Sequence, residues 1–109
     1  MSKLIVSANS FQHMETLLDK DVYGVLLFIA KLSVNSNFYV NVEEIENIDF
    51  KGKKKFIVMN KIMHNDDLNM VRDILTLLKD KECKILFYDI GVYNIALELG
   101  IAKTTLEYF

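Results

Sequence analysis

The chain has 109 residues, a length that fits a single domain with one hydrophobic core. Its composition of 51% hydrophobic and 26% charged residues is typical of a globular protein and excludes a chain that stays disordered for lack of apolar surface. The formal net charge of −2 gives no electrostatic reason to expect a nucleic-acid partner. We therefore expect one globular domain over residues 1–109.

Cysteine usage and hydrophobic segments indicate where the protein is located. Cys83 is the single cysteine, so an internal disulfide cannot form, and the chain does not open on a signal-peptide pattern. The longest apolar run, residues 25–30, is far shorter than the ~20 residues that a membrane-spanning helix needs. These features favour a cytoplasmic protein without a membrane segment.

The first strand–helix unit is short and has clear ends. Residues 4–6 form an apolar, partly β-branched run that predicts a strand. Asn9 or Ser10 is the expected helix cap, and apolar residues then recur at helical spacing as far as Leu18. Polar residues at 19–21 end this helix.

The second unit combines a strong strand with a weak helix. Residues 22–30 are apolar without alternation, as in a strand that is covered on both faces of a parallel sheet. The segment at 31–40 is irregular and unusually long for such a connection. Residues 41–44 resemble a capping box, so we expect a short helix from there to about residue 48.

The third and fourth units have the clearest patterns. Residues 56–59 predict a strand, and the helix after it is expected to be capped by Asn65 and to carry an apolar stripe. Residues 84–89 predict the fourth strand, followed by a helix over 92–99 that Gly100 ends. Strands that alternate with helices in this way pair in parallel through right-handed crossovers.

Four such units predict an α/β fold with a parallel sheet. A complete barrel of eight units needs ~250 residues, so this chain matches half of a TIM-like (β/α)-barrel. A half-barrel leaves two unpaired sheet edges and an apolar inner face. We therefore expect a homo-oligomer, or a partner chain that completes the barrel.

Polar residues follow two neighbouring strands at their carboxyl ends, where barrel enzymes place catalytic groups. Asn60 follows the third strand and Asp89 ends the fourth, so these two side chains are candidates for one pocket. His64 lies beside Asn65 and two aspartates, and histidine and carboxylates are common proton carriers and metal ligands. For all three candidates the sequence leaves open a turn or helix-capping role.

Two segments resemble the collagenase-like peptidase family U-32. Residues 58–68, Val-Met-Asn-Lys-Ile-Met-His-Asn-Asp-Asp-Leu, are similar to a family strand that ends in Asn and to the His-Asn-acid-Leu step that opens the next helix. Residues 85–92 and 96–100 are similar to the family's next strand, whose terminal Asp precedes a helix with a Leu-Gly stop. The resemblance implies the amino-terminal half of a barrel domain and a peptidase activity.

The resemblance also bears on cofactors. Some relatives in this family hold an iron–sulfur cluster with cysteines in their later part, and this chain contains no such cysteine-bearing motif. Cys83 alone cannot bind a cluster that needs several thiolates. We expect no cofactor in this chain and assign no set of metal ligands.

The leading hypothesis from the sequence is a U-32 peptidase-like barrel fragment with its pocket at the carboxyl ends of the strands. The residues alone do not decide whether the chain is an active enzyme. The alternative is a non-catalytic half-barrel interaction module that self-associates or completes a partner.

Overall fold

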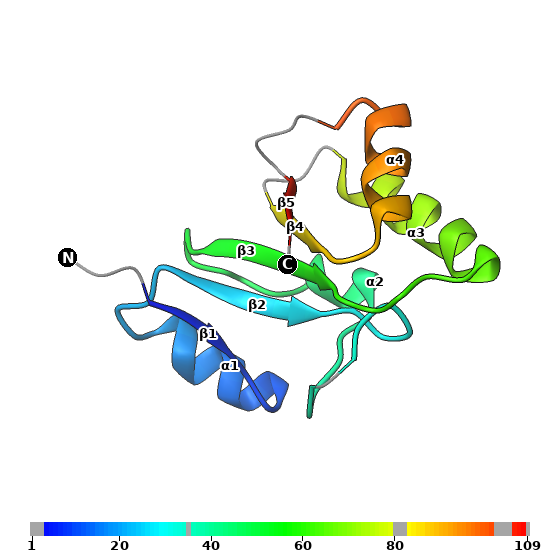
Figure 1. Cartoon of the computed structure of the whole chain (residues 1–109). Helices are drawn as coiled ribbons and strands as arrows, with labels where there is room; N and C mark the ends of the chain where they lie inside the picture. The colour runs from blue at the N-terminus through cyan, green and yellow to red at the C-terminus, as the bar shows by residue number, and fades with distance from the viewer. Residues whose placement is uncertain (1–3, 35, 80–82, 102–105, 109) are drawn as a thin grey trace.

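The computed structural model describes residues 4–34, 36–79 and 83–101 together with the backbone of 106–108. In this part of the chain five strands form one sheet: β1 (Ile5–Ser7), β2 (Gly24–Phe28), β3 (Lys54–Met59), β4 (Lys84–Phe87) and β5 (Leu106–Tyr108). The helices found there are α1 (Phe11–Leu18), α2 (Val42–Ile45), α3 (Asn65–Leu78) and α4 (Ile90–Glu98) (Figure 1).

The strands lie in chain order across the sheet, and every neighbouring pair is parallel. Successive strand–helix–strand crossovers produce this order, and such crossovers are right-handed as a rule. The α/β fold with a parallel sheet, predicted from the sequence, is confirmed. Strand β5 was not predicted, since the pattern indicated only four strand–helix units.

The described helices and one face of the sheet share a hydrophobic core. Alternate residues of β2 and β3, such as Leu27 and Ile57, pair across the strands and are almost fully buried in it. Helix α3 contributes a stripe at helical spacing, formed by Val71, Ile74, Leu75 and Leu78. This stripe was predicted, and it explains why α3 packs along the sheet.

The intervening residues of the same strands point to the opposite face, because side chains alternate along a strand. The apolar residues on this second face are Leu26, Phe28, Phe56, Val58 and Leu86. They lie outside the core that the helices cover, although Phe56 and Val58 are buried by their neighbours. The sheet is therefore apolar on both faces.

Two helices begin earlier than the sequence pattern indicated. Asn65 was expected to cap α3, but the cap is His64, because the side chain of Asp67 accepts a hydrogen bond from the His64 N–H. Asp89 was expected to end a strand, but it caps α4 by accepting a hydrogen bond from the Gly91 N–H. Both differences follow from side-chain bonds to main-chain groups that a pattern of apolar residues does not reveal.

Helix α2 is a single turn and ends sooner than predicted. Its predicted cap is confirmed, since the Glu44 side chain accepts a hydrogen bond from the Asn41 N–H at 2.8 Å. The buried residues Val42 and Ile45 anchor the turn in the core. No helix in the described part of the chain has the length and apolar character needed to cross a bilayer.

Replacing Leu75 with alanine should lower the free energy of unfolding by about 2–5 kcal/mol, because it empties a fully buried position in the core. Leu77→Ala in the same helix is the matched control: its side chain is 52% exposed, and the change should cost less than about 0.5 kcal/mol. Urea unfolding followed by circular dichroism measures both values. Similar losses in the two variants would contradict the observed orientation of α3.

Candidate functional site

The loop between β2 and α2 folds back onto the carboxyl edge of the sheet. Its ends meet where Ile29 and Val40 form a parallel bridge, as in a compact surface loop with neighbouring ends. The buried hydroxyl of Ser33 accepts a hydrogen bond from the Ile29 N–H at 2.8 Å and donates one to the carbonyl of Val58. These bonds attach the loop to β3.

Asn60 fastens the same loop from the end of β3. Its Oδ1 atom accepts a hydrogen bond from the Val34 N–H at 2.8 Å, and its Nδ2 atom donates one to the Val34 carbonyl at 3.1 Å. Because both bonds reach the backbone of one residue, the amide acts like a short strand pairing. Asn60 is thus a clamp between two neighbouring loops.

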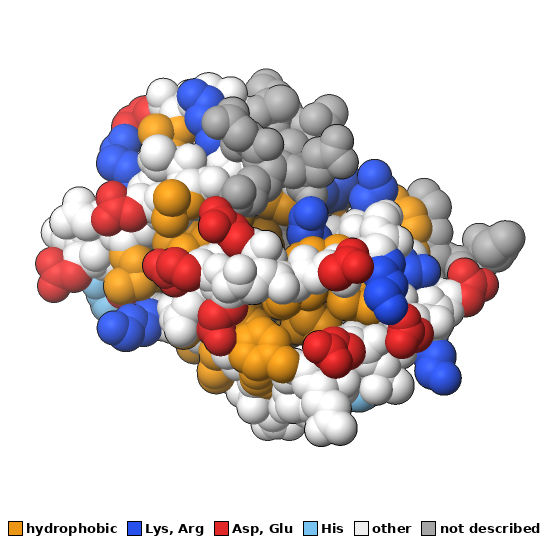
Figure 2. Space-filling model, turned by 180° about the vertical axis from the view of Figure 1, so that it is seen from behind, with side chains coloured by type: hydrophobic (Ala, Val, Ile, Leu, Met, Phe, Trp, Pro, Cys, Tyr) orange, Lys and Arg blue, Asp and Glu red, His pale blue; other side chains and the backbone are white. Residues whose placement is uncertain are grey.

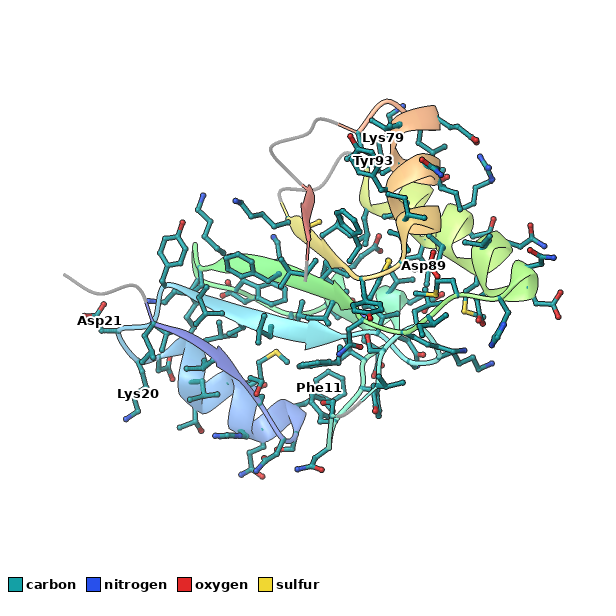
Figure 3. The ribbon with its side chains drawn as sticks, viewed as in Figure 1. Phe11, Lys20, Asp21, Lys79, Asp89 and Tyr93 are labelled. Atoms are coloured by element: carbon teal, nitrogen blue, oxygen red, sulfur yellow. The ribbon has the colours of Figure 1, made fainter. Side chains whose placement is uncertain are left out.

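Asp89 connects the loop after β3 to the start of α4. Its Oδ2 atom accepts a hydrogen bond from the Met63 N–H at 2.8 Å, and its Oδ1 atom accepts one from the Gly91 N–H at 2.7 Å. Gly91 permits this approach, because a Cβ there would lie 3.0 Å from Asp89 Oδ1 and 2.9 Å from a methyl of Leu68. Figure 3 shows Asp89 where β4 gives way to α4.

A charged group lies at the beginning of α3. The Nζ atom of Lys61 lies 3.1 Å from Asp67 Oδ2 and 3.4 Å from the carbonyl of Lys31. The same Asp67 oxygen accepts a hydrogen bond from the His64 N–H at 2.9 Å. That bond, followed by the one from Lys61, lowers the pKa of Asp67 below its ordinary value of 3.8. The His64 side chain next to this pair is exposed.

The structure puts the three predicted site residues in loops at one edge of the sheet but gives them separate partners. Among the hydrogen bonds of the described residues, none joins Asn60, His64 and Asp89 to one another. Of the turn and helix-capping roles that the sequence left open, capping is observed for His64 and Asp89, whereas Asn60 instead holds a neighbouring loop through its bonds to Val34. A catalytic role for the three stays a prediction.

Sequence reasoning missed Ser33 and the Lys61–Asp67 ion pair. Ser33 lies in an irregular segment where polar residues are ordinary, so its burial left no signal. Lys61 and Asp67 are six residues apart, which is not a spacing that brings side chains together on a helix. A turn before α3 brings them together, and only the structure reveals it.

Two large apolar side chains are exposed at this edge of the sheet. Ile62 is 63% exposed and Ile90 is 64% exposed, and each is the sequence neighbour of one partner in the hydrogen bond from the Met63 N–H to Asp89. The exposed imidazole of His64 lies in the same loop as Ile62, and imidazoles commonly serve as proton carriers in enzymes. In the described residues no three acidic, histidine or cysteine side chains are grouped so that they could hold a metal ion.

Similarity to known proteins is limited. No protein-family model matches the chain, and no solved structure matches it. An uncharacterized protease of Methanocaldococcus jannaschii is 26% identical over 107 residues, a match that covers 93% of this chain and 26% of the relative. The chain therefore spans about a quarter of that protein, and its similarity to a protease is weak but extends over most of its length.

Replacing Asn60 with alanine should release the loop at Val34 and lower the free energy of unfolding by about 0.5–1.5 kcal/mol, because two solvent-exposed backbone groups exchange their partner for water. Hydrogen exchange measured by NMR should show faster exchange of the Val34 amide. Asn94→Ala, at an exposed position of α4, is the control and should leave that amide unchanged. Unaltered protection of Val34 in Asn60→Ala would show that the clamp is not maintained in solution.

Asp67→Asn should remove a pH-dependent contribution to stability. Because the pKa of Asp67 is depressed in the folded protein, its ionised form stabilises the fold above the unfolded pKa, and this contribution disappears as the pH falls through the lower folded value. Wild type should thus exceed Asp67→Asn in stability at about pH 6, with the difference shrinking below about pH 4.

Thermal unfolding of both proteins across this pH range tests the expectation. Asp66→Asn is the matched control, because it removes a charge from the same helical turn without breaking the bonds to His64 and Lys61. The same pH dependence in both variants would rule out a particular role for Asp67.

Proposed function

We propose that the chain is the barrel segment of a U-32-type peptidase, with residues 1–109 forming one domain that acts in the cytoplasm. The observation that carries the proposal is the match to a protease along 93% of the chain. The segments that resemble U-32, residues 58–68, 85–92 and 96–100, contain Asn60, His64 and Asp89. The segments that resemble the family thus include all three candidate site residues.

The five-stranded sheet, in this proposal, is part of a TIM-like barrel. Parallel strands in sequential order are the arrangement found in such barrels. Barrel closure would bury the second apolar face of the sheet and pair its two edge strands, β1 and β5. A second copy of the chain, or a partner chain, would supply the remaining strands. No finding favours the alternative of a non-catalytic interaction module.

The proposed reaction is hydrolysis of a peptide bond at the carboxyl edge of the sheet. Exposed Ile62 and Ile90 would contact apolar side chains of the substrate. The imidazole of His64 would take a proton from a water molecule as its oxygen adds to the peptide carbonyl, and would return the proton to the departing amine. Asn60 and Asp89 would position the loops that hold these groups.

Hydrolysis of fluorescein-labelled gelatin tests the proposal when it is measured over a range of protein concentrations, with the mass of the chain determined by light scattering. Turnover should increase with the assembled fraction, because the completed barrel forms the pocket. His64→Gln should lower kcat by about 100-fold or more while the protein stays folded, because this side chain is exposed and its loss affects only the cap of α3.

His13→Gln is the matched control, since it removes the other histidine and should leave turnover unchanged. Folded, assembled protein without turnover, or equal losses in the two histidine variants, would refute the peptidase proposal. A monomer at every concentration would refute completion of the barrel by a second copy.

A further inference from the structure

A groove runs along the helix side of the molecule, between α1 and α2. It has a volume of about 590 Å³ and is lined by residues of α1, of α2 and of the turn that follows α2. The groove is open because α2 has only 4 residues, whereas α1 has 8 and α3 has 14. The short second helix leaves a flank of α1 accessible.

The centre of the groove is apolar. Met14 and Leu18 of α1 form its buried floor, and half-buried Ile48 faces them from the turn after α2. Phe11 at one end is 39% exposed and packs edge-on against Phe38, with 5.0 Å between the ring centres. Figure 3 shows Phe11 at the start of α1, near the loop that leads to α2. Apolar surface is thus available to a ligand.

The rim of the groove is acidic. The carboxylates that line it are Glu15, Asp19, Glu44 and Asp49, and the single basic residue in the lining is Lys51. These five side chains carry a net charge of −3, whereas the whole chain carries −2. The rest of the protein is therefore slightly positive. Figure 2, which views this side, shows apolar side chains bordered by acidic ones.

Most of these carboxylates are held in place by bonds along the rim. Asp49 accepts a hydrogen bond from the Lys51 N–H at 3.0 Å, and Glu44 accepts one from the Asn41 N–H at 2.8 Å. The hydrogen bond from the Lys51 ammonium lowers the pKa of Asp19, which therefore stays ionised at neutral pH. The described carboxylates do not converge into a group that could hold a metal ion. Their spread suits an extended cationic ligand.

We propose that this groove binds a basic amphipathic helix of a partner protein. In such a helix apolar residues recur every three to four positions and lysines or arginines lie beside them, so the apolar row would enter the groove while the cations meet the rim. Helix α1 is about 12 Å long, which matches two to three turns of a ligand helix. The proposal does not depend on the peptidase activity, because the groove lies on the helix side and the candidate site at the carboxyl edge.

Fluorescence anisotropy of a labelled peptide of about 14 residues, with leucines on one helical face and lysines on the other, tests the proposal with the full chain. At about 50 mM salt we expect a micromolar Kd. Glu15→Lys reverses a rim charge and should weaken binding about fivefold or more. Asp73→Lys makes the same charge change at an exposed position of α3 and should weaken it less than about twofold.

Two further comparisons distinguish binding in the groove from general electrostatic attraction between the peptide and the protein. Phe11→Ala keeps every charge and should weaken binding about threefold or more, because it removes apolar contact area. A peptide of the same composition without an apolar face should bind at least about tenfold more weakly.

Three results would overturn the proposal: equal effects of Glu15→Lys and Asp73→Lys, equal binding of the two peptides, or unchanged binding by Phe11→Ala. If the wild-type protein is a dimer and Glu15→Lys dissociates it, the groove is occupied by a second copy of the chain. That result would also overturn the proposal of a partner helix.

Discussion

The structure depends on a parallel sheet whose strands are apolar on both faces. Main-chain bonds between sequential strands bring Leu27, Ile57 and Ile85 into one row, and the helices bury that row in the core. A sheet of this kind needs cover on its other face too, because the intervening residues are also apolar. This requirement is the physical link between the fold and the proposal that further strands complete a barrel.

The carboxyl edge of the sheet is organised by side chains that bind main-chain groups. Ser33 bonds to β3, Asn60 to the loop after β2, and Asp89 to the loop after β3. Each supplies a hydrogen-bond partner to a main-chain group near the carboxyl ends of the strands. His64 caps α3 at the same edge, and its side chain is exposed. In the proposed peptidase, positioning of the loops and proton transfer would belong to different residues of this edge.

Much of this fold could be predicted from local pattern, whereas the contacts at the site could not. Four strands and the apolar stripe of α3 follow from the spacing of apolar residues. Strand β5 is as short as β1, but its sequence Leu-Glu-Tyr has a charge at the centre and lacks the apolar run that indicated β1. The position of Asn60 at a strand end was readable, yet its bonds to Val34 cross 26 positions of sequence. The His64 cap depends on the hydrogen bond from the His64 N–H to the Asp67 side chain. Several nearby polar residues could have made such a bond, so the sequence does not single out this pair.

The site and the groove share one structural cause in the segment between β2 and β3. Residues 29–53 of this connection are about as numerous as residues 60–83 between β3 and β4, where α3 takes up most of the length. In the first connection the chain instead forms the loop that Ser33 and Asn60 fasten to the sheet edge, and only one helical turn remains. Residues that form the loop at the carboxyl edge cannot also lengthen α2, so α2 does not extend over α1. The connection between β2 and β3 therefore forms both the fastened loop at the strand ends and, through its short helix, the open acidic groove on the helix side.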